Sequence, residues 1–524
     1  MKKYTKITAF LLSILLLLIV ACSPNGGQEP PGASGNGQSE TQPPVVAETP
    51  EPQVTPDGGD DGDSGDNGDD RNNGGDNDDM ISIDLSDIPK PGFGEDFPIQ
   101  GGTILHAFCW SINTIAENIA YIAAAGFTAV QTSPITESIT DSPWSPQPSG
   151  MQLWGEGAWW FHYQPISYRI GNYQLGTEED FIEMCRVAKE HGIKVIVDAV
   201  VNHFTSEFHK IRDEVLEIEG GAVRMNDVSG SGRLAQTHGR LLGLYDVITE
   251  NPNMQQAVLE YLKRCIELGA SGFRYDAALH IELPDDPENI RSDFWPVILE
   301  NGSEFQYGEI LDPAWGTNYA RFMPVTDSAY GNNIVGATRT GRFRAELLTN
   351  YRVQAPASQL VTWVESHDTF CNEGVTSDLT PEQIVYGWAV LASRSDSTPL
   401  FLSRPASSSP GLATRWGNNV VGERGNNHFM SREIAALNWF KRAMHGSEEH
   451  LSNPIDDVLS LLMIQRGNNG VVIINTGEEI VLENIGAELL DDGTYIDVLS
   501  GNEFVVSGGK ISGTVNAESI VVIY

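Results

Sequence analysis

The sequence is poor in basic residues and in cysteine, and each shortage bears on function. It has 32 lysines and arginines against 71 aspartates and glutamates, a formal net charge of -39. A surface of that sign repels nucleic acid and other anionic polymers, so a neutral or cationic partner is expected. The chain has 5 cysteines, none at metal-ligand or redox spacing. Buried thiols are favoured over a disulfide framework for the four that follow Cys22, which are Cys109, Cys185, Cys265 and Cys371.

Long apolar runs are also scarce, and the one at the N-terminus is short. Residues 7–21 are almost wholly apolar and follow three lysines. A membrane-spanning helix needs about 20 apolar residues, so a cleaved secretory signal peptide over residues 1–21 is favoured over a spanning anchor. The run ends in Ile-Val-Ala-Cys22, which resembles a bacterial lipobox whose cysteine is diacylated. We therefore expect an exported lipoprotein, anchored through Cys22 to the bacterial cell surface or membrane with its folded body extracellular; the alternative is an ordinary cleavage site beside a chance cysteine.

Residues 22–80 form the next segment and lack any periodic apolar pattern. Proline and glycine dominate first, followed by aspartate, glycine and asparagine. Such a chain cannot bury enough apolar surface to fold, and its like charges repel one another, so we expect a disordered acidic linker. Calcium binding by the aspartate-rich run over 57–79 is the alternative, although that run lacks the residue order of a calcium-binding loop.

From about residue 100 the pattern becomes that of a packed α/β domain. Short apolar runs predict buried strands, and the amphipathic segments between them predict helices. The strands are expected over 102–108, 127–131, 193–198 and 272–276, and the helices over 112–125, 178–191 and 252–268.

Four carboxylates lie at or just beyond the C-terminal ends of predicted strands: Asp198, Asp276, Glu309 and Asp368. In a (β/α)8 barrel that end is the active-site face. A doubly wound sheet also binds ligands there, but it would not explain carboxylates from so many separate strands around one site. We therefore predict an α/β fold, a (β/α)8 TIM barrel over residues 81–450.

The pattern changes again after residue 450. Short strands separated by glycine, asparagine and aspartate turns are expected over 459–464, 470–475, 480–483, 494–499 and 519–524. This spacing predicts a C-terminal antiparallel β-sandwich over residues 451–524.

Four segments carry a functional pattern. They are DAVVNH at 198–203, GFRYDAALH at 272–280, YGEIL at 307–311 and WVESHD at 363–368. In this order they resemble the four signature regions of glycoside hydrolase family 13, the α-amylase family. Two further segments extend the resemblance, which spans about residues 100–450: residues 159–165 resemble the aromatic substrate platform of α-amylases, and residues 244–247 resemble the segment that closes their domain B.

The resemblance implies a retaining endo-hydrolase of α-1,4-glucosidic bonds in starch, glycogen and maltooligosaccharides. It implies a short domain B at about 204–245, inserted after strand 3 of the barrel. It also implies Asp276 as the nucleophile, Glu309 as the general acid/base and Asp368 as the carboxylate that holds the distorted sugar. A retaining glycosidase needs one carboxylate to attack the anomeric carbon and another to protonate the leaving oxygen, so Glu309 has to be protonated at neutral pH.

Arg274 precedes the proposed nucleophile by two residues on the same strand, so both side chains point to the same face. A guanidinium there stabilises the carboxylate form of Asp276. The resemblance adds further sugar contacts, with Tyr163 as the ring beneath the sugar; they are Trp159, Trp160, Tyr163, His203, His280 and His367. Burial in the core is the alternative for the two tryptophans.

The resemblance also implies a calcium site made by Asn202, Asp246 and the backbone carbonyl of His280. Oxygen ligands suit calcium. Without a metal, Asn202 would be a simple turn residue. Asp198 is expected to organise the site, or alternatively to cap a helix.

Two positions depart from the family pattern. Leu279 stands where α-amylases usually carry a lysine that reaches sugars on the reducing-end side, which leaves the product pattern open. Ser366 stands where chloride-activated members carry asparagine, so no chloride requirement is expected. Two alternatives stay open: a related family 13 specificity (maltogenic, α-1,6-cleaving or transglycosylating), and a non-catalytic surface glucan-binding lipoprotein. A monomer is expected.

Overall fold

The computed structural model describes residues 84–91, 96–142, 157–372 and 374–524. The predicted signal peptide, the lipidation site Cys22 and the acidic linker lie outside these described residues. Within them, no helix is both long enough and apolar enough to span a bilayer.

Eight parallel strands close into a barrel in the order β1-β12-β11-β10-β9-β8-β5-β2. They are β1 (Ile104–His106), β2 (Ala129–Gln131), β5 (Lys194–Ala199), β8 (Gly272–Tyr275), β9 (Phe305–Gly308), β10 (Val325–Thr326), β11 (Leu360–Trp363) and β12 (Thr398–Leu402). Side chains such as Ile104, Ile196 and Val361 fill the barrel interior as one buried cluster. The predicted (β/α)8 barrel is thereby confirmed.

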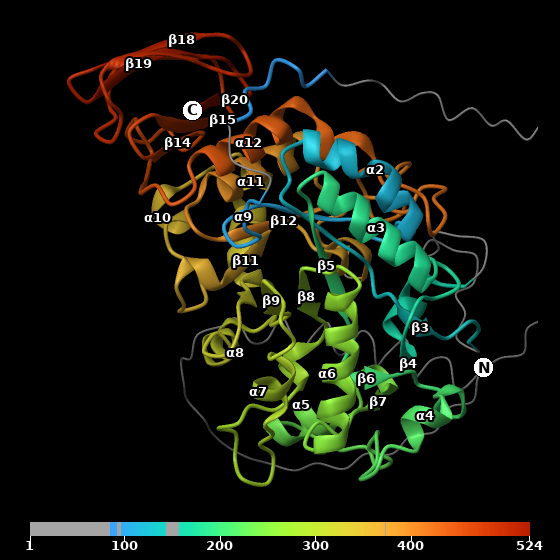
Figure 1. Cartoon of the computed structure of the whole chain (residues 1–524). Coiled ribbons are helices and arrows are strands. Elements are labelled where there is room, and N and C mark those ends of the chain that lie inside the picture. Colours follow the sequence, from blue (N-terminus) through green and yellow to red (C-terminus); the bar gives the residue numbers. More distant parts are fainter. Residues whose placement is uncertain (1–83, 92–95, 143–156, 373) are drawn as a thin grey trace, which may run out of the picture. The chain divides into compact units, whose positions relative to one another are not determined.

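Helices follow the barrel strands and cover their outer face (Figure 1). They are α2 (Ile112–Ala124), α3 (Glu178–Glu190), α6 (Pro252–Glu267), α7 (Phe294–Ile298), α8 (Pro313–Tyr319), α9 (Ser328–Thr340), α10 (Ala345–Leu348), α11 (Pro381–Ser393) and α12 (Arg432–Ala443). Local sequence sets several of their starts. A capping box begins α3, because the side chains of Thr177 and Asp180 accept hydrogen bonds from backbone N–H groups at the start of the helix. The Asn251 side chain caps α6 in the same way, and Pro252 follows it at the first helical position, where an N–H has no partner within the helix.

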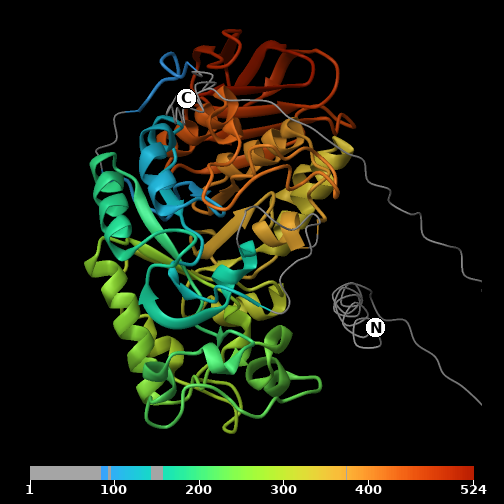
Figure 2. The ribbon, with the colours of Figure 1, turned by 90° about the vertical axis from the view of Figure 1, so that its right-hand side faces the viewer.

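Two excursions leave the barrel on the side where the candidate site lies. The first follows β2 and contains the hairpin of β3 (Thr136–Ser138) and β4 (Pro165–Ile170). The second follows β5, the third barrel strand in sequence, and contains α4 (Asp213–Leu216) and α5 (Arg233–His238). Its ends are joined where β6 (His203–Phe204) pairs with β7 (Tyr245–Asp246). Figure 2 shows this second excursion in green at the bottom of the view.

The C-terminal part consists of two four-stranded antiparallel sheets, which confirms that part of the predicted fold. One contains β13 (Glu449–Ser452), β14 (Leu461–Arg466), β15 (Gly470–Asn475) and β20 (Ser519–Ile523); the other contains β16 (Ile480–Gly486), β17 (Gly493–Ile496), β18 (Glu503–Ser507) and β19 (Lys510–Val515). The sequence prediction omitted β13, β18 and β19. Of these, β18 alternates exposed and buried residues, a signal that could have identified it.

The first of these sheets is buried on both faces. Leu461 and Ile473 belong to the core between the two sheets, whereas Leu462 and Ile474 belong to the main cluster that also contains the barrel helices. Successive side chains of a strand point to opposite faces, so one sheet contributes to both cores. The sheet therefore joins the sandwich to the barrel through continuous apolar packing.

Candidate active site

The four predicted carboxylates all lie at the carboxyl ends of barrel strands. Asp198 is the fifth residue of β5, Asp276 directly follows β8, and Glu309 directly follows β9. Asp368 begins the π-helical turn Asp368–Asn372, which follows β11 after a short connection. The strand ends thus bring together residues that are separated by up to 170 positions in the sequence.

One guanidinium connects three of these carboxylates. Arg274 Nη1 lies 2.8 Å from Asp198 Oδ1 and 2.7 Å from Asp276 Oδ1, and its Nη2 lies 2.6 Å from Glu309 Oε1. Arg274 is buried, and its carboxylate neighbours raise its pKa far enough to outweigh the desolvation that opposes its charge. It therefore stays cationic and holds the acids of three neighbouring strands in one constellation.

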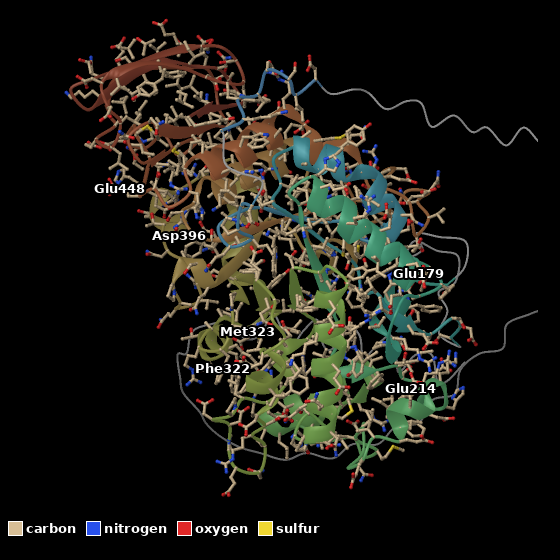
Figure 3. All side chains as sticks on the ribbon, in the orientation of Figure 1. Glu179, Glu214, Phe322, Met323, Asp396 and Glu448 are labelled. Carbon is tan, nitrogen blue, oxygen red and sulfur yellow. The ribbon has the colours of Figure 1, made fainter. Side chains whose placement is uncertain are left out.

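The backbone around Glu309 is shaped to hold it. A Cβ on Gly308 would come within 2.8 Å of the terminal methyl group of Met323 (Figure 3). Only glycine therefore fits there without displacing a neighbour. Ala277 adopts a left-handed conformation with φ of 50°, which costs an alanine roughly 1–2 kcal/mol. In that conformation its N–H donates to Glu309 Oε2 at 3.0 Å, so the strain serves to orient the carboxyl group.

Burial changes the charge state of this group of acids. Desolvation raises the pKa of Glu309 to about 7, although Arg274 opposes the rise. Desolvation also raises the pKa of Asp198 to about 7, again against Arg274. The pKa of Asp368 is raised by burial, with Arg274 opposing. Near neutral pH the cluster therefore retains protons, and a carboxylic acid is available as a proton donor.

Aromatic and imidazole groups form the other half of the site. The Tyr163 ring stacks on His367 with centroids 5.4 Å apart and planes 10° apart, and its hydroxyl donates to Asp198 Oδ2 at 3.0 Å. His203 Nε2 lies 3.1 Å from the Tyr163 carbonyl. Burial lowers the pKa of His367 to about 4, so this imidazole is neutral at pH 7. These groups present a flat ring edge and neutral hydrogen-bonding groups, a combination that suits a sugar.

A cavity of about 410 Å³ contains most of the predicted site residues. Its walls include Asp276, Glu309, Asp368, Trp159, Trp160, Tyr163, His203, His280 and His367. The two tryptophans differ, since Trp159 is 2% exposed and packs against Phe108 and Trp416, whereas Trp160 is partly exposed. Of the two, Trp160 therefore offers the larger surface to a ligand.

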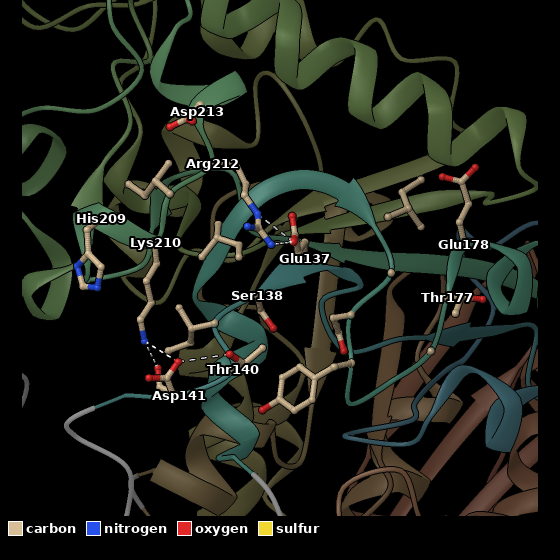
Figure 4. Close-up of a pocket in the computed structure, with 18 of the residues that line it drawn as sticks. Glu137, Ser138, Thr140, Asp141, Thr177, Glu178, His209, Lys210, Arg212 and Asp213 are labelled. Carbon is tan, nitrogen blue, oxygen red and sulfur yellow. Dashed lines mark hydrogen bonds and ion pairs between the residues drawn. The ribbon is translucent and has the colours of Figure 1, made fainter.

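A larger hollow of about 850 Å³ lies beside the β3–β4 hairpin and contains none of the four carboxylates (Figure 4). Its lysine and arginine are already paired with acids: Arg212 Nε donates to Glu137 at 3.0 Å, and Lys210 Nζ lies 3.0 Å from Asp141. Volume alone would favour this hollow, but reactive groups converge only in the smaller one. The smaller cavity is therefore the candidate active site.

Several residues of the site escaped the sequence prediction. Asn372 donates to Asp368 Oδ1 at 2.6 Å, and His106 lies edge-on to His367 with centroids 5.2 Å apart. Arg404 forms a bidentate ion pair, at 2.8 and 2.7 Å, with Glu365, which lies in the loop between β11 and Asp368. Asn372 could have been suspected because it stands four residues after Asp368 on the same turn. The pairing of Glu365 with Arg404 has no local signal.

The residues predicted to bind calcium fit a hard cation. The Oδ1 atom of Asn202 is buried and has no hydrogen-bond partner among the described residues, and Val247 N–H binds the Asn202 carbonyl at 3.0 Å. Asp246 is buried next to Val247, and Arg224 Nε donates to only one of its oxygens, at 2.8 Å. An amide oxygen and a carboxylate are ligands that calcium accepts.

The remaining ligands would be backbone or amide oxygens, such as the predicted carbonyl of His280, or water. Within the described part of the chain, no three His, Cys, Asp or Glu side chains are grouped so that they could hold a metal ion. The His280 ring is itself engaged, since its Nδ1 lies 2.9 Å from the Gln236 carbonyl.

Comparisons with known proteins point to the family that the motifs resemble. Residues 98–221 match the family model described as alpha amylase, catalytic domain. The chain is 39% identical over 475 residues to an alpha-amylase of Butyrivibrio fibrisolvens, covering 81% of this chain and 47% of that protein. It is 33% identical over 445 residues to an alpha-amylase of Clostridium acetobutylicum, covering 81% of this chain and 54% of that protein. The chain spans about half the length of these curated relatives.

Solved structures agree at the level of the fold. Alpha-amylase I of Eisenia fetida, solved in complex with maltohexaose, aligns with a TM-score of 0.63 at 20% identity over 82% of this chain and 99% of that chain. The match to the catalytic-domain model, the identity to the two bacterial relatives and the closed barrel are mutually consistent. The chain therefore belongs to the α-amylase family, glycoside hydrolase family 13.

Proposed function

We propose that this protein is an α-amylase that hydrolyses internal α-1,4-glucosidic bonds of starch, glycogen and maltooligosaccharides with retention of configuration. The observation that best supports this is the Arg274 guanidinium, which binds Asp276 through Nη1 and Glu309 through Nη2. Two carboxyl groups bound to the same guanidinium lie close together, which is compatible with the separation of about 5–5.5 Å in a retaining pair.

In the first step Asp276 attacks the anomeric carbon while Glu309 gives its proton to the leaving oxygen. The elevated pKa of Glu309 suits this role because the acid keeps its proton near neutral pH. In the second step Glu309 takes a proton from water, which displaces Asp276 from the sugar. Asp368, held by Asn372, and the neutral imidazoles of His203 and His367 would bind the hydroxyls of the same sugar above the Tyr163 ring.

The decisive variant is Asp276→Asn. The amide keeps the size of the side chain but cannot attack the anomeric carbon, so kcat should fall at least about 10³-fold. Release of reducing ends from soluble starch measures kcat, and circular dichroism checks the fold. The exposed Asp213→Asn is the matched control and should keep wild-type activity. Substantial turnover by a correctly folded D276N protein would refute the assignment, and a wild-type protein inactive on starch would favour the non-catalytic glucan-binding alternative.

Calcium is part of the proposal as a structural ion. Asn202, Asp246 and the His280 carbonyl would hold it, joining the β6–β7 ladder to the turn after β8. A bound ion stabilises the folded state by about 2.7 kcal/mol at a hundredfold excess over its Kd. Chelation should therefore lower Tm by several degrees, and Asn202→Ala should remove most of that response, whereas the exposed Asn418→Ala should retain it. Identical melting with calcium and with chelator in the wild type would refute the proposal.

Three further elements of the proposal rest on the sequence alone. They are export with lipid anchoring at Cys22, a monomeric state, and activity without chloride. Nearby, the buried Arg404 is already neutralised by Glu365, which is consistent with a site that needs no added anion.

A further inference from the structure

Five leucines line the active-site cavity: Leu241, Leu242 and Leu244 from one part of the chain, and Leu279 and Leu311 from two others. Leu242 comes from the excursion after β5, Leu279 from the turn after β8, and Leu311 from the loop after β9. Leu242 is 59% exposed and Leu311 is 44% exposed, although leucine is a side chain that folding normally buries. Exposed apolar groups that gather on one wall of a cavity mark a surface that contacts a ligand. We call Leu242, Leu279 and Leu311 the leucine face.

The backbone at Leu242 is strained. Its φ is 55° and its ψ is 20°, in the left-handed region that costs a residue with a Cβ roughly 1–2 kcal/mol. The turn is held in place because Leu244 N–H donates to the Leu241 carbonyl at 2.9 Å. With 59% of Leu242 exposed, burial of its side chain offsets little of this cost. Strain that packing does not explain is typical of functional positions.

Two residues of the leucine face stand close to the proton donor along the chain. Leu311 follows Glu309 by two residues, and Leu279 follows Ala277, whose N–H binds Glu309, by two residues. The turn at Leu279 is fixed, because its carbonyl accepts hydrogen bonds from Arg233 at 2.8 Å and from Tyr319 at 3.1 Å. Of the proposed sugar-binding groups, Tyr163 instead donates to Asp198, and His367 Nε2 lies 3.6 Å from Asp368 Oδ2.

We propose that the leucine face determines specificity for the leaving group, and that the enzyme accepts α-maltosides of apolar alcohols as substrates. This rests on the proposed retaining mechanism, in which the proton donor marks the position of the leaving group. The bond between the anomeric carbon and the alcohol oxygen breaks as Asp276 bonds to that carbon, and the proton of Glu309 passes to the alcohol. Water then replaces Asp276 and returns a proton to Glu309. The polar residue His280 lies next to Leu279 in the cavity wall, and its ring Nδ1 is already hydrogen-bonded to the Gln236 carbonyl.

Methyl and butyl α-maltotrioside provide the test, because their alcohols are similar leaving groups and differ only in apolar surface. Each buried methylene contributes about 0.8 kcal/mol, or roughly fourfold, so half burial of three methylenes predicts that kcat/KM is about eightfold higher for the butyl compound. The measurement is release of each alcohol by the full chain. Leu242→Ser with Leu311→Ser should reduce the preference for the butyl compound below about threefold.

Leu347→Ser is the matched control, because Leu347 is 57% exposed on α10, outside the cavity. This variant should keep the wild-type preference. A wild-type ratio near one, or a ratio unchanged in the double variant, would overturn the inference. Cleavage of starch by the same preparation separates the two proposals: starch cleavage with no butyl preference refutes only the leucine face, whereas no cleavage of starch refutes the proposed function itself.

Discussion

At the scale of single residues, Glu309 links catalysis to stability. Burial raises its pKa from an ordinary 4.5 to about 7. The folded protein therefore keeps a proton that the unfolded chain loses as the pH rises above 4.5. Stability from this group is complete below pH 4.5 and is lost as the pH rises through about 7. In the proposed mechanism the same proton passes to the leaving group, so kcat/KM should fall above about pH 7.

Glu309→Gln tests this linkage, because glutamine has nearly the same shape and does not titrate. Relative to wild type, the variant should gain up to about 3 kcal/mol of stability between pH 5 and pH 8, since one pKa unit corresponds to 1.36 kcal/mol. Urea unfolding at the two pH values measures the difference. Wild-type and variant stabilities that change in parallel with pH would show that Glu309 does not carry the elevated pKa.

At the scale of an element, the loop after β11 is held by one ion pair. Glu365 precedes His367 and Asp368, and both Glu365 and its partner Arg404 are almost fully buried. Arg404 also donates to the carbonyls of Leu379 and Thr376, each at 2.9 Å. The pair thus ties the loop that carries two site residues to the segment that follows β12.

Removing one partner should be worse than removing both. Arg404→Met leaves Glu365 buried without a counter-charge, which should lower the free energy of unfolding by about 3–5 kcal/mol. The double variant Glu365→Leu, Arg404→Met leaves no unpaired charge and should recover much of this loss. Thermal unfolding measures stability, and kcat reports whether Asp368 is displaced. A double variant no more stable than the single one would argue against the ion-pair explanation.

At the scale of the whole molecule, one sheet of the sandwich packs against the helices of the barrel. Val472 on β15 belongs to the cluster that includes residues of α11 and α12, whereas Val471 belongs to the core between the two C-terminal sheets. Because both faces of this sheet are buried, unfolding of the sandwich would expose apolar surface of the barrel helices. The two parts are therefore expected to unfold together.

Val472→Asp should disrupt both parts, because it places an unpaired charge in an apolar core. Activity and the calorimetric transition should be lost together at a lower temperature than in the wild type. Val481→Asp is the control, since Val481 is 58% exposed on β16. An active barrel that persists after the sandwich has unfolded would show that the two parts are independent.

Much of this arrangement follows from local sequence pattern. The apolar runs and amphipathic segments predict four strands and three helices of the barrel, because a 2-residue or 3.6-residue period is set by the backbone itself. The position of a carboxylate at a strand end is likewise a local property. Asp276, Glu309 and Asp368 could therefore be assigned to one face from their spacing alone. Strand β13, with one large apolar residue in four, had no such signal.

Other features depend on distances that only packing sets. Glu365 and Arg404 are 39 positions apart, Leu242, Leu279 and Leu311 line one cavity from three segments, and Trp159 is buried beside Trp416. The pKa values near 7 belong to this class, because desolvation and charge–charge interaction depend on neighbours in space. Backbone periodicity and short motifs were therefore enough to predict the barrel, the carboxylates at its strand ends and the family resemblance. The charge state of Glu309 and the apolar wall of the cavity depend instead on packing, because burial is a property of the folded chain.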